Sequence, residues 1–274
     1  MNLNELKRHA INIRLNIVDM VYNAHSGHIG GSLSAADILT YLYFEEMNIN
    51  ADNLASTNRD RFVLSKGHAS PSLYAALSER GLLKEDLKSF RHIDSKLQGH
   101  PNMNYVPGVD MSTGSLGQGI SAAVGMAIAN KLDGNNQRVY VLIGDGESQE
   151  GLVWEALMAA AHYKLDNLCV ILDLNHLQID GRIEDVMNPG PHKAKFEAFG
   201  LKVAECDGHD FESIAKAFEV FHQTKGQPTA IIAHTTKGKG VSFMEDNYKW
   251  HGTAPKEDEY KAAHAELLKI KEAL

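Results

Sequence analysis

The chain has 274 residues, 43% of them hydrophobic and 23% charged, which is ordinary usage for a globular protein of one large domain or two small ones. Its formal net charge of −8 argues against nonspecific binding to nucleic acid or to an anionic membrane. There is no signal-peptide core and no apolar run that could span a bilayer, and Cys169 and Cys206 lie in apolar runs without a CxxC pattern, so we expect a cytoplasmic protein with two reduced core thiols.

Helices dominate the first half of the chain. Ser34 is suited to cap one of them, with Asp37 three residues on, and Ser70 is suited to cap another, with Pro71 at its first position and Gly81 at its end. A stretch rich in glycine and alanine predicts a further helix that packs very closely against a neighbour. The elements expected here are helices at 4–24, 34–46, 70–81 and 117–132 and a short strand at 61–65.

Strands and helices alternate in the second half. The strands are almost continuously apolar, which is typical of a parallel sheet that helices cover on both faces. We therefore expect one α/β domain over residues 1–274, with its ligand site at the carboxyl ends of the strands. The elements expected here are strands at 138–144, 168–174, 201–206 and 228–236 and helices at 150–165, 210–225 and about 257–273.

Asp145 directly follows an apolar strand and lies between Gly144 and Gly146. Asn175 follows the next strand, after one crossover helix, so both side chains are expected at the same edge of the sheet. Carboxylate and amide oxygens suit Mg²⁺ or Ca²⁺ and do not suit Zn²⁺. The helix that begins near Glu150 points its free amides to this edge, which favours phosphate. The pattern indicates a site for a metal-bound diphosphate.

Other interpretations of this pattern are simpler. Asp145 alone is also suited to cap a helix, and Asn175 to make a turn. A dinucleotide site is not indicated, because no GxGxxG follows a strand. A nucleotide P-loop is not indicated either, because "TTKGKG" (235–240) lacks the spacing GxxxxGK[ST].

GDG followed about thirty residues later by Asn resembles the thiamine-diphosphate-binding motif, and several further segments resemble transketolase. The resemblance covers most of the chain in the right order and implies the thiamine-diphosphate-binding fold. The matching segments are "SGHIGGSLS" (26–34), "NRDRFVLSKGHASPSLYA" (58–75), "GHP" (99–101), "STGSLGQGISAAVGMA" (112–127), "GDGESQEGLVWEA" (144–156), "NHLQIDG" (175–181) and "HTTKGKGVSFMED" (234–246).

The resemblance also implies a cofactor site. The metal, Mg²⁺ or Ca²⁺, would be ligated by the side chains of Asp145 and Asn175 and by the backbone oxygen of Leu177. In many members the residue matching Ser115 is proline, a difference that we expect to alter loop stiffness while leaving the backbone contacts available. The residues implied to contact thiamine diphosphate are His68, Gly114, Ser115, Leu116, Asp145, Gly146, Glu150, Asn175, Ile179 and His251.

Further positions follow from the same resemblance. Ile179 would pack near the thiazolium ring of the cofactor, and Glu150 and Glu155 would lie at a subunit interface. For Glu155, an exposed charge on a helix is the alternative.

Four of the fourteen histidines lie in loops next to glycine or proline: His28, His68, His100 and His251. Transketolases line a substrate channel with histidines at these places, and imidazole both donates to sugar hydroxyls and transfers protons. We expect His28 and His251 to act in proton transfer on the substrate oxygen, and His68 and His100 to bind donor or cofactor. Taken singly, each is equally well interpreted as a solvated loop histidine.

The remaining histidines carry no expected site role. His25 and His28 do not predict a zinc site, because no cysteine or third histidine is suitably spaced. Those expected to pack, to support the site from outside or to lie at the surface are His9, His162, His176, His222 and His234.

A whole transketolase resembles this chain followed by two further domains, which carry the glutamate that activates the aminopyrimidine and most cations that hold the sugar phosphate. No segment after His251 resembles them. We therefore expect the N-terminal subunit of a split transketolase, which is active only with a C-terminal partner subunit in an assembly of two copies of each chain. The expected reaction transfers a two-carbon ketol unit from a ketose phosphate to an aldose phosphate, as in the pentose phosphate pathway.

Three alternatives remain for the function. The first is the diphosphate-binding subunit of a 2-oxo-acid dehydrogenase, against which the four histidines and the "TTKGKG" region argue. The second is a non-catalytic module that binds the cofactor, against which the intact set of metal ligands argues. The third is a split transketolase for a branched or sulfonated sugar, which this half of the site does not distinguish.

Overall fold

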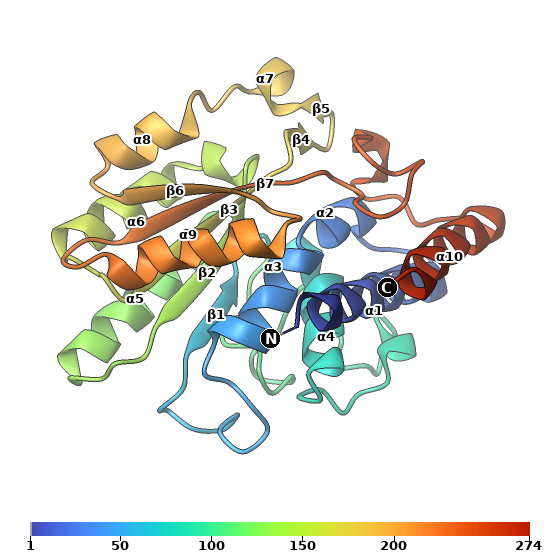
Figure 1. Ribbon diagram of the computed structural model, residues 1–274, viewed down its shortest axis with the longest axis horizontal. Helices are drawn as coiled ribbons and strands as arrows, with labels where there is room; N and C mark the ends of the chain where they lie inside the picture. Colours follow the sequence, from blue (N-terminus) through green and yellow to red (C-terminus); the bar gives the residue numbers. More distant parts are fainter. Residues whose placement is uncertain (1) are drawn as a thin grey trace.

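Five parallel strands form the central sheet of the computed structural model, which describes residues 2–274 (Figure 1). Their spatial order is β1-β2-β3-β7-β6, so the α/β fold with a parallel sheet is confirmed. A separate antiparallel hairpin joins β4 (Leu177–Gln178) to β5 (Gly181–Arg182). The five strands are β1 (Arg61–Leu64), β2 (Val139–Gly144), β3 (Leu168–Leu174), β6 (Lys202–Asp207) and β7 (Thr229–His234).

Both faces of the sheet are buried, which explains why the strands are apolar throughout. Along β2, Tyr140 and Leu142 pack into one hydrophobic cluster, while Val141 and Ile143 pack into the other. This alternation follows from the two-residue period of a strand. Each face of the sheet therefore needs its own layer of helices.

Three helices share the core on one face: α5 (Gln118–Leu132), α6 (Gly151–His162) and α8 (His192–Ala198). Figure 1 shows α9 across the opposite face. Gly119 of α5 lies so close to β1 that an added Cβ would meet the Cα of Ser65 at 2.7 Å, which is the close packing expected for this stretch. The helices that share the second core are α1 (Leu3–Ala24), α2 (Ile29–Ser34), α3 (Ala36–Tyr41), α4 (Ser70–Glu79), α9 (Phe211–Gln223) and α10 (Glu257–Glu272).

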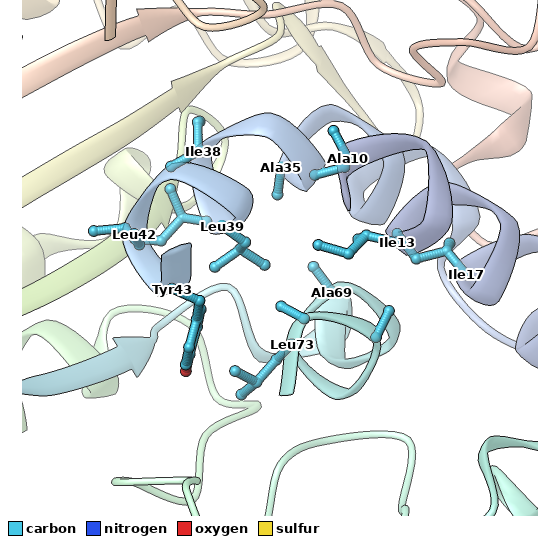
Figure 2. Packing of buried hydrophobic residues seen from close by; sticks show 14 of the residues in the cluster. Ala10, Ile13, Ile17, Ala35, Ile38, Leu39, Leu42, Tyr43, Ala69 and Leu73 are labelled. Carbon is cyan, nitrogen blue, oxygen red and sulfur yellow. The ribbon is translucent and has the colours of Figure 1, made fainter. Parts of the chain in front are cut away.

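The second core extends beyond the sheet because α1 and α4 pack on α3. Figure 2 shows Ile13 of α1, Leu39 of α3 and Leu73 of α4 converging on a common centre. All three side chains are almost completely buried. Helix α10 lies against the outer side of α1 (Figure 1), and no helix among residues 2–274 is long and apolar enough to cross a membrane.

Two predicted helix starts are wrong. The helix expected at 34–46 is broken into α2, α3 and a π-helical turn at Leu42–Glu46, and Ser34 ends α2 without capping a helix. Its hydroxyl donates to Asp173 Oδ2 at 2.7 Å, because a buried carboxylate competes for it. Ser70 is the first residue of α4, not its cap, and donates to the carbonyl of Gly99 at 2.9 Å.

Other local expectations are confirmed. Gly81 ends α4 in the left-handed region, with φ of +76°, where glycine meets no steric penalty. Cys169 and Cys206 are both buried and free. The remaining element, α7 (Ile183–Val186), follows the β4–β5 hairpin and was not expected from the sequence.

Candidate functional site

A cavity of about 300 Å³ opens at the carboxyl ends of β1, β2 and β3. Most of the residues expected at a cofactor site line it, although Ser115 and His100 do not. Ser115 is exposed between two lining residues, and His100 stands outside with its ring against Gly114. The expected residues that line the cavity are His28, His68, Gly114, Leu116, Asp145, Gly146, Glu150, Asn175, Leu177, Ile179 and His251.

Parallel pairing places Asp145 and Asn175 together. Gly144 at the end of β2 is in register with Asp173 near the end of β3, so the residues that follow both strands lie at one edge. The Asp145 carboxylate accepts from the amides of Gly146 at 2.7 Å and His176 at 2.5 Å. The main chain at the two strand ends thereby holds this carboxylate in one orientation.

The surroundings of Asp145 favour a cation. The residue is 2% exposed, and burial together with the nearby Asp173 raises the pKa of its carboxyl to about 6. No described residue brings a third acidic or histidine side chain within ligating distance, since residues 2–274 contain no group of three or more His, Cys, Asp or Glu that could hold a metal. A divalent ion at Asp145 would therefore depend on amide and backbone oxygens, the donor set that Asn175 and Leu177 offer.

Two buried lysines line the cavity, and the sequence analysis did not single them out. Lys237 Nζ donates to the carbonyl of Leu177 and to His251 Nδ1, both at 2.9 Å. Lys66 Nζ donates to the carbonyl of Gly31 at 3.0 Å and pairs with the buried Asp173. Burial and the charge of Lys66 lower the pKa of Lys237 to about 8. A lysine beside glycine directly after a predicted strand, in "SKGH" and "TTKGKG", was the available signal.

Three histidines from three different loops meet over the cavity. The ring centroids of His28, His68 and His251 are 5.2 to 5.4 Å apart in pairs, and His100 lies 6.5 Å from His28. The Nδ1 atom of His28 is buried without a hydrogen-bond partner, which leaves it free for a ligand. The structure brings together residues that are far apart in the chain, as the resemblance implies.

These imidazoles are neutral near pH 7. Burial, followed by the charge of Arg91, lowers the pKa of His28 to about 4. Burial, followed by the charge of Lys237, lowers the pKa of His251 to about 3. Burial also holds the pKa of His68 well below its ordinary value. Neutral imidazole both accepts and donates hydrogen bonds, as contact with sugar hydroxyls requires.

Glu147 connects three of the loops that line the cavity and was not anticipated. Its Oε1 accepts from Ser65 Oγ at 2.6 Å and from the Gly117 amide at 2.9 Å, and its Oε2 accepts from the Gly144 amide at 3.0 Å. The carboxylate is 2% exposed, and burial raises its pKa. It fixes the loops after β1 and β2 and the start of α5 relative to one another.

The mouth of the cavity is apolar and open. Ile179, in the β4–β5 hairpin, is 64% exposed. Glu150 lines the cavity as the residue before α6, which begins at Gly151, and Glu155 is exposed on the same helix. The five histidines without an expected site role lie outside the cavity: His9, His162, His176, His222 and His234.

Comparison with known proteins places these features in a family. The profile described as "Transketolase, thiamine diphosphate binding domain" matches residues 6–269. One of the two subunits of apulose-4-phosphate transketolase from Actinobacillus succinogenes is 45% identical over 237 residues, 85% of each chain. A 6-deoxy-6-sulfo-D-fructose transketolase subunit of Clostridium sp. (strain MSTE9) is 42% identical over 229 residues, 83% of each chain.

A solved structure agrees with these sequence matches. Transketolase from Campylobacter jejuni aligns with a TM-score of 0.91 and 40% identity, covering 97% of this chain and 43% of that one. The expected thiamine-diphosphate-binding fold is confirmed. The chain belongs to the transketolase family, and it comprises the family's thiamine-diphosphate-binding domain.

Proposed function

We propose that this chain is the diphosphate-binding subunit of a two-subunit transketolase, which transfers a two-carbon ketol unit from a ketose phosphate to an aldose phosphate. The observation that carries the proposal is one cavity lined by Asp145, Asn175, Leu177 and three neutral histidines. Thiamine diphosphate, when bound, supplies the carbon nucleophile and the electron sink. The chain supplies binding, orientation and control of protons.

The metal and the diphosphate would be held at the strand ends. Asp145, Asn175 and the backbone oxygen of Leu177 would ligate Mg²⁺ or Ca²⁺. The ammonium of Lys237 already donates to that oxygen, which supports a cation-binding role for this carbonyl. The diphosphate would contact Lys237 and the residues expected from the sequence: His68, Gly114, Ser115, Leu116, Gly146, Glu150, Ile179 and His251.

The histidines would act on the sugar. His28 and His251 would exchange a proton with the substrate oxygen, because both rings are neutral near pH 7 and both line the cavity. His68 and His100 would bind donor or cofactor. Replacement of His251 by alanine should lower kcat for ketol transfer by about 100-fold or more, the usual contribution of a general acid or base. Unchanged kcat would exclude its role in proton transfer.

A partner subunit would complete the site. The two relatives named as subunits match along more than four fifths of both chains, which supports the same division here. We propose a cytoplasmic assembly of two copies of this chain, folded as one domain over residues 1–274, with two copies of a C-terminal subunit. Glu150 and Glu155 would lie at its interfaces.

The sugar donor has two candidate classes. Relatives named for apulose 4-phosphate and for 6-deoxy-6-sulfo-D-fructose are 45% and 42% identical, which favours a branched or sulfonated donor as the alternative to the sugars of the pentose phosphate pathway. Membership of the transketolase family argues against the 2-oxo-acid dehydrogenase alternative.

The test is a ketol-transfer assay on the chain alone and on the complex purified from its own cells. Thiamine diphosphate and Mg²⁺ are added, ribose 5-phosphate is the acceptor, and xylulose 5-phosphate is compared with branched and sulfonated donors. We expect activity only in the complex. Activity of the chain alone would contradict the two-subunit proposal. No activity with any donor, although the complex binds the cofactor, would favour a non-catalytic module.

A further inference from the structure

Lys237 lies in a loop at 235–240 that has no regular secondary structure. Gly238 and Gly240 have φ of +80° and +95°, and an added Cβ on Gly238 would meet the Met244 carbonyl oxygen at 2.3 Å. The ammonium of Lys237 is nevertheless buried and directed to two acceptors in the cavity. A loop of this kind needs support from outside to hold a buried cation in place.

Three side chains outside the cavity provide that support: Arg14 of α1, Asp37 of α3 and His209 before α9. Arg14 forms a two-pronged ion pair with Asp37, at 2.9 and 2.6 Å. Asp37 Oδ2 lies 2.7 Å from His209 Nδ1. Arg14 is 3% exposed and Asp37 is 5% exposed, so the pair is fixed by the packing of α1 against α3. We call these residues the Arg14–Asp37–His209 clamp.

The clamp holds the loop at two points that flank Lys237. His209 Nε2 accepts from the Thr236 amide at 2.8 Å. Arg14 Nε donates to the Lys239 carbonyl at 3.0 Å. The residues held lie one before Lys237 and two after it, so the path of the backbone through Lys237 is determined on both sides.

The hydrogen bonds also determine the tautomer of His209. The Thr236 amide can only donate, so Nε2 must be unprotonated, and the ring proton lies on Nδ1, facing the Asp37 carboxylate. Arg14 keeps this carboxylate ionised, which holds the pKa of Asp37 well below its ordinary value. His209 is therefore oriented as an acceptor for the loop.

We propose that the Arg14–Asp37–His209 clamp positions Lys237 in the cofactor cavity, so that His209 is a positioning residue for cofactor binding. The nature of the bound cofactor rests on the function proposed above. The position of the loop does not depend on that function, and the two are tested separately.

Two substitutions of His209 separate its two contacts. In His209→Gln the amide reaches the place of Nε2 and retains an acceptor for the Thr236 amide. In His209→Asn the shorter amide reaches only the place of Nδ1, so it retains the Asp37 contact and leaves the Thr236 amide without a partner. His222→Asn is the matched control, because His222 also bonds a carboxylate, that of Glu46 at 2.7 Å, far from the loop.

Hydrogen exchange of residues 236–240 in the full chain is the first measurement, and the dissociation constant for thiamine diphosphate at saturating Mg²⁺ is the second. We expect His209→Asn to raise both about tenfold, the effect of one lost buried hydrogen bond. We expect His209→Gln and the control to stay within about twofold of the unaltered chain. The melting temperatures of the two His209 variants should be alike.

Unchanged exchange in His209→Asn, or equal losses in both His209 variants, would overturn the proposal. If His209→Asn does not fold, ¹⁵N chemical shifts of the His209 ring in the unaltered chain decide the matter: the Nδ1–H tautomer is expected, and the Nε2–H tautomer overturns the proposal. Exchange that separates the variants as expected, in a chain that binds no thiamine diphosphate, supports the clamp and contradicts the proposed function alone.

Discussion

Glu147 offers the sharpest test of how the cavity is held together. Its carboxylate accepts three hydrogen bonds from three separate segments, and Glu147→Gln changes one oxygen into an NH₂ group without changing the size of the side chain. Whichever way the amide turns, it places a donor against the amide of Gly144 or of Gly117. One buried main-chain N–H then loses its acceptor.

The cost follows from this geometry. A buried donor without a partner costs about 1–3 kcal/mol. Part of this is offset, because burial raises the pKa of Glu147 and a neutral amide is easier to bury than a carboxylate. We expect the free energy of unfolding to fall by about 1–2 kcal/mol, which lowers Tm by about 3–6 °C for a domain of this size.

Thermal and urea unfolding of the cofactor-free chain measure this loss. Glu197→Gln is the matched control, since Glu197 is exposed on α8 and its replacement should change stability by less than about 0.5 kcal/mol. Affinity for thiamine diphosphate should fall in Glu147→Gln and stay unchanged in the control. A Glu147→Gln chain as stable as the unaltered one would refute the view that this carboxylate joins the loops.

Three further predictions concern the cavity. Lys237→Met should weaken binding of thiamine diphosphate roughly ten- to hundredfold, measured by calorimetry, without lowering the free energy of unfolding, because an apolar side chain replaces a buried cation; Lys239→Met, in the same loop, is the control, and equal losses would contradict the role of Lys237. In the unaltered chain, cofactor and Mg²⁺ at about 100 times the dissociation constant should add about 2.7 kcal/mol to the free energy of unfolding, and Asp145→Asn should abolish this gain; a retained gain would exclude Asp145 as a metal ligand. The pKa of His251 falls on folding from 6.5 to about 3, so its contribution to stability is complete above pH 6.5 and is lost as pH falls toward 3; His251→Asn should reduce the loss between pH 6 and 4 by about 1.4 kcal/mol per pH unit in unfolding titrations, and an unchanged slope would contradict the buried, neutral ring.

The sequence by itself determined the sheet and the edge at which the site lies. The apolar runs of β2 and β3 are visible because both faces of a parallel sheet are buried, and one crossover helix between them requires Asp145 and Asn175 to reach the same edge. Motifs that resemble transketolase identified the histidines at positions 28, 68 and 251, which line the cavity.

Tertiary structure alone decided which polar groups are buried and what they bond. Ser34 looked like a helix cap, and its hydroxyl instead donates to Asp173, a residue 139 positions further along the chain. Glu147, Lys237 and His209 have no periodic pattern that reveals them, because their partners come from distant segments. Periodicity reports local geometry, whereas a buried charge is positioned by every loop that meets it, and those loops are brought together only when the two cores form.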